Sequence, residues 1–119
     1  MLAVDDSSTN RLILSRMLQA LGHRVETAVD GEHAVDAVAA GAFDLILMDV
    51  QMPGIGGVEA SRRIRSLAGP SASTPIIAVT ADTSAADCAL YRDAGMVGLV
   101  GKPLSPAGLQ AEISRVACR

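Results

Sequence analysis

Five polar side chains stand at the ends of short apolar runs in this 119-residue chain, and their types suit one kind of chemistry. In chain order they are Asp5, Asp6, Asp49, Thr80 and Lys102. Carboxylates that meet in one place repel one another strongly unless a cation joins them. An oxygen-only site with few protein ligands suits Mg²⁺, which keeps several waters and accepts phosphate oxygens. The three carboxylates therefore predict a magnesium site if the fold brings them together.

The lysine and the threonine add groups that suit a phosphoryl ligand. The ammonium of Lys102 is a point charge for one phosphoryl oxygen, and the Thr80 hydroxyl can donate to another. Together with a carboxylate and a divalent cation, these groups form a site in which the carboxylate accepts a phosphoryl group. Each residue also has an ordinary structural role as a cap, a strand residue or a solvated lysine. The prediction therefore depends on their convergence.

Hydrophobic patterning predicts the elements that must position these side chains. Short apolar runs bounded by Gly, Pro or Asp predict strands at 2–4, 24–29, 44–48, 76–79 and 97–100, the last three apolar on both faces. Amphipathic segments predict helices over 8–21, 31–40, 57–68, 83–94 and 105–118. Helix starts are predicted at Ser8, Asp30, Thr83 or Ser84, and Ser105, and helix stops at Gly22, Gly41, Gly69 and Gly95.

The alternation of strands and helices predicts an α/β fold. Five successive strand–helix units form a doubly wound, five-stranded parallel sheet with right-handed crossovers, and residues 1–119 suffice for one domain. Ligands of such sheets bind at the carboxyl ends of the strands. The five polar side chains are predicted at that edge.

Composition excludes several classes of function. Half of the residues are hydrophobic, whereas 2% are aromatic and the net charge is −3, which argues against a nucleic-acid-binding surface. No apolar run is long enough for a membrane span, and Cys88 and Cys118 have no paired spacing. We therefore expect a cytoplasmic domain with no membrane contact. Arg62, Arg63 and Arg65 are expected on a solvated helix face.

The ordered set of motifs resembles the response-regulator receiver domain over essentially the whole chain. The separations fit as well, with 43 residues from Asp6 to Asp49, 31 from there to Thr80 and 22 from there to Lys102. The resemblance implies a flavodoxin-like fold with strand order 2-1-3-4-5. The matching segments are Asp5-Asp6, residues 48–57, Val79-Thr80-Ala81, Asp93-Ala94-Gly95 and Gly101-Lys102-Pro103.

The resemblance also implies a role for each acidic residue. Asp49 would be the phosphoacceptor, Asp6 a direct ligand of Mg²⁺, and Asp5 a partner acting largely through water. The backbone carbonyl of Gln51 would complete the protein's share of the magnesium shell. The domain would catalyse its own phosphorylation and dephosphorylation without being a turnover enzyme.

Two further implications concern the switch. Thr80 would be the switch hydroxyl, and Lys102, joined to Pro103 by a cis peptide bond, would pair first with Asp49 and then with the phosphoryl group. Receivers commonly carry Tyr or Phe three residues before the lysine, but this position is Leu99. We therefore expect small activation changes over residues 83–110.

The residues around Asn10 and in segments 49–53 and 80–82 resemble those of receivers in hybrid histidine kinases and phosphorelays. The donor would then be the phosphohistidine of a sensor kinase or a phosphotransfer protein. We expect it to contact the first helix, where Leu12 falls outside the predicted apolar arc. That arc comprises Ile13, Leu14, Met17, Leu18, Ala20 and Leu21.

Two other functions share parts of this pattern. A phosphatase of the haloacid-dehalogenase type also forms an aspartyl phosphate with Mg²⁺, but usually has a second Asp where this chain has Gln51. A flavodoxin-like cofactor binder would use residues 7–10 as a phosphate cradle, where Asp5 and Asp6 repel an anion. Turnover of a generic phosphomonoester would favour the first alternative, and a coloured protein the second.

Overall fold

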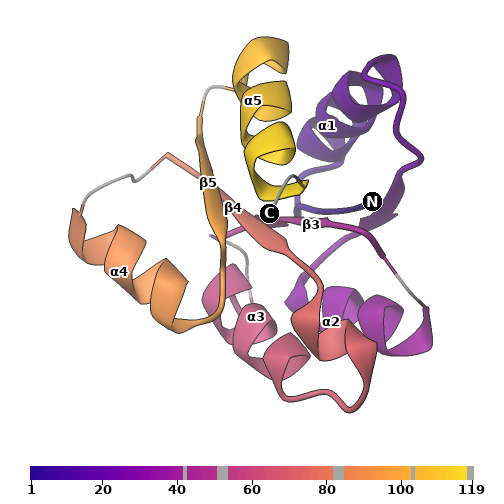
Figure 1. The fold of residues 1–119 in the computed structure, drawn as a ribbon. Helices are drawn as coiled ribbons and strands as arrows, with labels where there is room; N and C mark the ends of the chain where they lie inside the picture. Colours follow the sequence, from indigo (N-terminus) through magenta and orange to yellow (C-terminus); the bar gives the residue numbers. More distant parts are fainter. Residues whose placement is uncertain (42, 51–53, 82–84, 103, 118–119) are drawn as a thin grey trace.

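The computed structural model describes residues 1–41, 43–50, 54–81, 85–102 and 104–117. Strands and helices alternate along the chain (Figure 1). The strands are β1 (Leu2–Val4), β2 (Glu26–Ala28), β3 (Ile46–Asp49), β4 (Ile76–Thr80) and β5 (Gly98–Gly101). The helices are α1 (Ser8–Ala20), α2 (Gly31–Ala40), α3 (Gly57–Arg65), α4 (Ala85–Asp93) and α5 (Pro106–Ala117), with a short 3₁₀ turn η1 (Pro70–Ser73) before β4.

The strands form one parallel sheet in the order β2-β1-β3-β4-β5, as predicted. The register pairs Asp49 with Val79, and Thr80 with Gly101. The carboxyl ends of β3, β4 and β5 therefore meet at one edge of the sheet. Asp49 and Thr80 are the last residues of their strands rather than the first residues after them, so strand geometry fixes their backbones.

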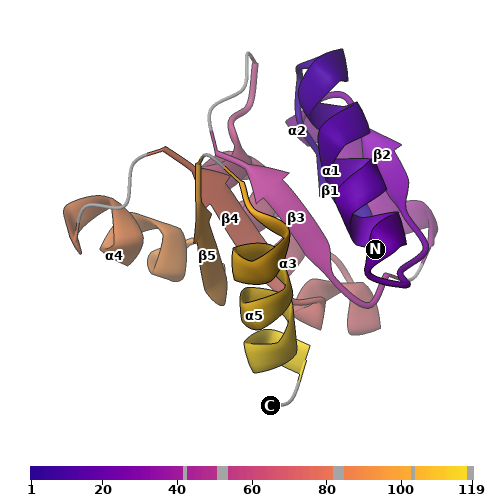
Figure 2. The ribbon, with the colours of Figure 1, turned by 90° about the horizontal axis from the view of Figure 1, so that it is seen from above.

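Helices cover both faces of the sheet (Figures 1 and 2). Successive side chains of a strand point to opposite faces. Accordingly, Ile46 and Met48 of β3 pack with α2, α3 and Tyr91 of α4, whereas Leu47 packs with α1 and α5. All residues of β3 and β4 are buried, which confirms the prediction of strands covered on both faces. β5 differs because it is an edge strand, with Gly101 exposed and Val100 buried.

Side-chain caps begin three of the helices in the described part of the chain. At the start of α5, Ser105 accepts a hydrogen bond from the backbone N–H of Gly108, as predicted. Asp30 accepts a hydrogen bond from the backbone N–H of His33, as predicted for the start of α2. For α1 the predicted start is shifted by one residue: Ser7 is the cap and accepts from the N–H of Asn10, so Ser8 is the first helical residue. Two adjacent serines make this choice ambiguous in the sequence.

Arg65 is not on a solvated face, and this prediction was wrong. Its guanidinium donates to the carbonyl oxygens of Gly95, Ala72 and Thr74 at 2.7–3.1 Å, and partial burial lowers its pKa. The side chain thus fastens α3 to η1 and to the loop after α4. Arg62 and Arg63 are exposed as predicted. Within the described ranges, none of the helices has the length and apolarity that a membrane crossing requires.

Candidate functional site

Three carboxylates converge at the carboxyl edge of the sheet. Asp5 and Asp6 follow β1, and Asp49 ends β3. One carboxylate oxygen from each lies within 4.8 Å of the others. Asp5 and Asp49 are buried, at 4% exposure each, whereas Asp6 is exposed. The cluster is therefore open to solvent on the side of Asp6.

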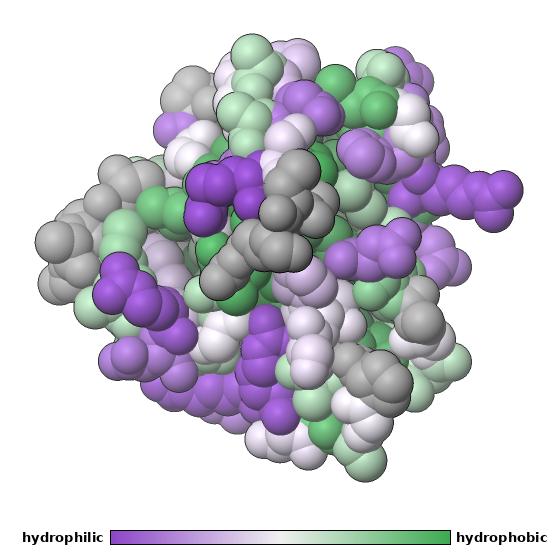
Figure 3. Space-filling view, in the orientation of Figure 1, coloured by the Kyte–Doolittle hydropathy of each residue, from purple (hydrophilic) through white to green (hydrophobic). Residues whose placement is uncertain are grey.

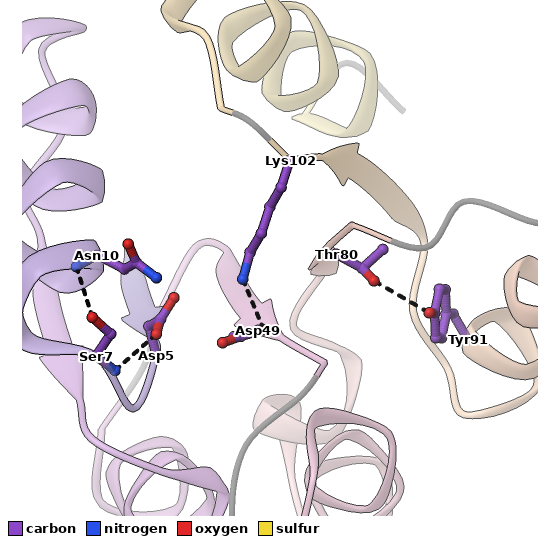
Figure 4. A network of polar contacts seen from close by, with 7 residues as sticks. All are labelled: Asp5, Ser7, Asn10, Asp49, Thr80, Tyr91 and Lys102. Atoms are coloured by element: carbon purple, nitrogen blue, oxygen red, sulfur yellow. Dashed lines mark hydrogen bonds and ion pairs between the residues drawn. The ribbon is translucent and has the colours of Figure 1, made fainter.

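Hydrogen bonds fix Asp5 in place before any ligand binds. The backbone N–H of Ser7 donates to Asp5 Oδ1 at 2.9 Å (Figure 4). The Arg11 guanidinium donates to the Asp5 carbonyl oxygen at 2.8 Å. The N–H of Asp5 donates to Ala28 at the end of β2. Asp5 is thus anchored through side chain and backbone, which suits a residue that acts on a cation at a fixed distance.

Lys102 reaches across the site from the end of β5. Its Nζ lies 3.4 Å from Asp49 Oδ1, and its side chain is 32% exposed, whereas that of Asp49 is 5% exposed (Figure 4). The backbone N–H of Lys102 donates to the Thr80 carbonyl at 2.9 Å, so β4 holds the base of the lysine. The ammonium offsets one of the three negative charges.

The first residue of α3 packs directly behind Asp49. A Cβ at Gly57 would overlap the backbone carbonyl of Asp49 and lie 2.9 Å from Met48 Cγ. Glycine permits this close approach of the helix to the strand end. Gly57 also donates its N–H to the Val50 carbonyl at 3.1 Å. The sequence segment 48–57 therefore shapes the backbone around the carboxylate.

The Thr80 hydroxyl is directed at Tyr91 rather than at Asp49 (Figure 4). Thr80 Oγ1 lies 3.4 Å from the Tyr91 hydroxyl oxygen, and both residues are buried. Sequence reasoning missed Tyr91, which lies on α4, because it looked for a ring only at the position of Leu99. The one usable signal is that this is the single tyrosine of the chain.

The structure leaves Leu99 without a comparable role. Its backbone N–H donates to Glu112 Oε2 at 2.6 Å, and Glu112 in turn accepts from Arg115. The hydrogen bond from Arg115 lowers the pKa of Glu112, with a smaller contribution from the Leu99 N–H. The acidic side chain is thus charged at neutral pH and joins α5 to β5.

The structure thus brings together five of the six residues in the predicted site. Asp5, Asp6, Asp49 and Lys102 share one cluster, and Thr80 ends the strand next to Asp49. Gln51, whose carbonyl was predicted as a ligand, lies outside the described residues, as does Pro103 with its predicted cis bond. The oxygen donors fit a small hard cation, because two buried carboxylates and one exposed carboxylate leave an excess of negative charge facing solvent.

Comparison with known proteins agrees with this geometry. Residues 1–114 match the response regulator receiver domain family. The chain is 44% identical over 108 residues to the two-component response regulator ORR41 of Oryza sativa, covering 87% of this chain and 83% of the relative. It is 40% identical over 106 residues to the sensor protein GacS of Pseudomonas syringae, covering 87% of this chain but 12% of that protein.

Solved structures give the same result. The receiver domain of a Pseudomonas aeruginosa sensor histidine kinase, which has a magnesium ion coordinated in its active site cleft, superimposes with a TM-score of 0.90 at 35% identity and covers 99% of this chain and 96% of its own. The chemotaxis protein CheY4 of Vibrio cholerae gives a TM-score of 0.91 at 36% identity, covering 97% and 95% of the two chains. This chain belongs to the response regulator receiver domain family of two-component signalling.

Proposed function

We propose that Asp49 is the phosphoacceptor of this receiver domain and that the donor is the phosphohistidine of a sensor kinase or a phosphotransfer protein. The observation that carries the proposal is the position of the Asp49 carboxylate, which lies at the end of β3 among two other carboxylates and 3.4 Å from the Lys102 ammonium. Neighbouring groups of both signs suit a carboxylate that must accept an anionic group.

The transfer step is an in-line displacement at phosphorus. A carboxylate oxygen of Asp49 forms the new P–O bond while the P–N bond of the phosphohistidine breaks. The electron pair of that bond goes to the histidine nitrogen, which takes up a proton. Water later attacks the same phosphorus, releases inorganic phosphate and regenerates the Asp49 carboxylate. One modification of the domain's own residue is made and removed in each cycle.

Asp5, Asp6 and Asp49 would hold Mg²⁺, together with the backbone carbonyl of Gln51. When bound, the ion neutralises the charge that gathers on the phosphoryl oxygens during transfer. Asp6 is suited to direct ligation because it is exposed at the open side of the cluster, whereas Asp5 is buried and already accepts a hydrogen bond from Ser7.

Lys102 and Thr80 would bind the transferred group. The Lys102 ammonium pairs with Asp49 in the free protein and can move to a phosphoryl oxygen without leaving the cluster. The Thr80 hydroxyl can turn to donate to a second oxygen. Neither residue needs to transfer a proton, so activity should not require a titrating base at this site.

A direct test uses acetyl phosphate and Mg²⁺ followed by intact-mass measurement. The wild-type chain should gain one phosphoryl group, and Asp49→Asn should gain none. Asp44→Asn is the matched control, because Asp44 is an exposed aspartate two residues before the start of β3, and its replacement should leave the adduct intact. An unchanged adduct in Asp49→Asn would refute the assignment, and rapid turnover of a generic phosphomonoester would favour a phosphatase instead.

We also propose that the donor docks on α1. Leu12 and Ile13 are 52% and 44% exposed. Ile13 and Ala20, both predicted to belong to the apolar arc, are therefore exposed rather than buried. Hydrophobic residues are visible over this helix at the upper right of Figure 3. A groove of about 270 Å³ beside them is lined by Asp5, Asn10, Ile13, Met17, Lys102 and Leu104. It runs from the exposed helix face to the phosphorylation site.

Replacing Leu12 tests this surface. Leu12→Asp should slow transfer from a phosphohistidine donor by roughly tenfold, since it removes one buried apolar contact. Phosphorylation by acetyl phosphate should not change, because that donor needs no protein surface. Leu90→Asp on α4 is the control, as Leu90 is 42% exposed but distant from the groove in sequence and fold. Equal transfer rates for wild type and Leu12→Asp would contradict the docking proposal.

A last proposal concerns the cellular setting. We propose that residues 1–119 form one receiver domain that acts in the cytoplasm, within a phosphorelay or as part of a hybrid histidine kinase. The match to 12% of the length of the sensor protein GacS supports this proposal, because the matched region there is one part of a longer sensor protein.

A further inference from the structure

Tyr91 is the main anchor of α4. Among the side chains of α4 that the structure describes, residues 87–93, Tyr91 alone is buried, at 6% exposure, whereas its neighbour Leu90 is 42% exposed. On the side facing β5 and α5 lies a cavity of about 610 Å³, which Tyr91 lines together with Cys88, Leu99 and Glu112. Within residues 87–93 the helix therefore has free space beside it, and Tyr91 is the side chain that packs inward.

The hydroxyl of that ring touches the phosphorylation site. It lies 3.4 Å from Thr80 Oγ1, at the end of β4, and the contact is buried on both sides (Figure 4). In Figure 4 the Thr80 hydroxyl points toward Tyr91 and not toward Asp49, and either hydroxyl can be the donor in this contact. Turning the Thr80 hydroxyl toward Asp49 carries it away from the ring.

We propose that the Thr80–Tyr91 contact holds α4 in its resting position and is released when Asp49 is phosphorylated. In this chain the ring that responds to the switch threonine would thus be Tyr91 on α4, because the position of Leu99 carries no ring. The inference rests on the proposed functions of Asp49 and Thr80. A contact made in one state and lost in the other is the differential interaction that a two-state change requires. The signal would pass to α4 rather than to β5.

The first test compares wild type with Tyr91→Phe, which keeps the ring and removes the hydroxyl. Both proteins are titrated with beryllofluoride in the presence of Mg²⁺, where beryllofluoride stands in for the phosphoryl group on Asp49. Because the variant lacks the contact that favours the resting state, it should bind beryllofluoride roughly three- to tenfold more tightly. Its α4 amide resonances should move little on binding, whereas those of wild type should move strongly.

A double-mutant cycle separates this role from simple packing. Thr80→Val keeps the shape of the side chain without the hydroxyl. If Tyr91 acts through Thr80, adding Tyr91→Phe to Thr80→Val should change beryllofluoride affinity by less than about twofold. A full effect of Tyr91→Phe in the Thr80→Val background would overturn the proposal, as would unchanged affinity and α4 shifts in Tyr91→Phe alone.

Tyrosine fluorescence gives an independent readout in the wild-type chain. Tyr91 is its single tyrosine and there is no tryptophan, so the emission reports the environment of this ring directly. The signal should change on beryllofluoride binding and not in Asp49→Asn. Wild type that fails to bind beryllofluoride would refute the proposed function itself. Binding without any change in Tyr91 emission would refute only the inference.

Discussion

At the scale of single residues, the site holds more negative charge than favours the stability of the folded chain. Two of its three carboxylates are buried at 4% exposure, and one ammonium at 3.4 Å from Asp49 faces the whole cluster. Like charges this close destabilise the folded chain, and such conflicts are typical of functional sites. The arrangement makes sense if a cation and a phosphoryl group complete it.

This repulsion predicts the stability of Asp49→Ala. Without Mg²⁺ at neutral pH, the variant should melt above wild type, by about 3–6 °C if roughly 1 kcal/mol of repulsion is relieved. Addition of Mg²⁺ should narrow the difference, because the ion stabilises the wild-type cluster more than the variant. Thermal melts in EDTA and in Mg²⁺ check this. A variant that melts at or below the temperature of wild type in EDTA would contradict it.

The acidic residues and Lys102 could be identified in the sequence because each ends or follows a short apolar strand, and parallel strands end at one edge of the sheet. Tyr91 could not. Its contact with Thr80 depends on how α4 lies across the sheet, and the pattern of one helix does not contain that information. The contacts of Arg65 could not be predicted for the same reason, since its three carbonyl partners lie in two other segments.

At the scale of elements, capping side chains fix where α1, α2 and α5 begin. Asp30 accepts the N–H of His33 at the start of α2, and the His33 ring lies 2.7 Å from the same carboxylate oxygen. The backbone hydrogen bond lowers the pKa of Asp30, and the carboxylate raises the pKa of His33. Caps of this kind are local signals, which explains why helix starts were predicted to within one or two residues.

The two pKa shifts give the stability contribution of Asp30 a defined pH range. A depressed folded pKa means that the cap stabilises the fold above the unfolded value of 3.8 and is lost as pH falls through the lower folded value. A raised folded pKa means that the His33 pairing stabilises below 6.5 and is lost as pH rises through the higher folded value.

Asp30→Ala should therefore cost most stability at about pH 5.5, somewhat less at about pH 8 and least at about pH 3. Loss of the cap itself should cost about 1 kcal/mol. Urea unfolding at the three pH values measures the differences. Ser7→Ala, which removes the cap of α1, is the matched control because its hydroxyl does not titrate. A penalty for Asp30→Ala that stays constant with pH would contradict the ion-pair argument.

At the scale of the whole molecule, alternating strands and helices left few possible folds. Right-handed crossovers and two-sided burial of β3 and β4 fit the order β2-β1-β3-β4-β5. The exposure of β5 was not predicted, because its sequence is as apolar as that of a central strand. An edge position follows from the strand order, which the resemblance supplied and the strand patterns alone do not contain.

The contacts of β5 and α5 determine how far the structural change caused by phosphorylation should extend. The absence of a ring at Leu99 led us to expect small changes over residues 83–110, but the contact of Tyr91 with Thr80 now exempts α4 from that expectation. For β5 and α5 we keep the expectation of small changes. Glu112 accepts the Leu99 N–H at 2.6 Å, and Arg115 donates both to Glu112 and to the Val97 carbonyl. These bonds join the two elements independently of the phosphorylation site.

Amide chemical shifts with and without beryllofluoride test this limit. Residues near Asp49 and Thr80 and those of α4 should shift strongly, whereas residues 98–101 and 106–117 should shift little, because no side chain on β5 is predicted to exchange partners. In Glu112→Ala the shifts should extend into α5, since the bonds that join it to β5 are weakened. Concerted shifts across β5 and α5 of the wild-type chain, as large as those beside Asp49, would show that the signal passes through the edge strand without a ring.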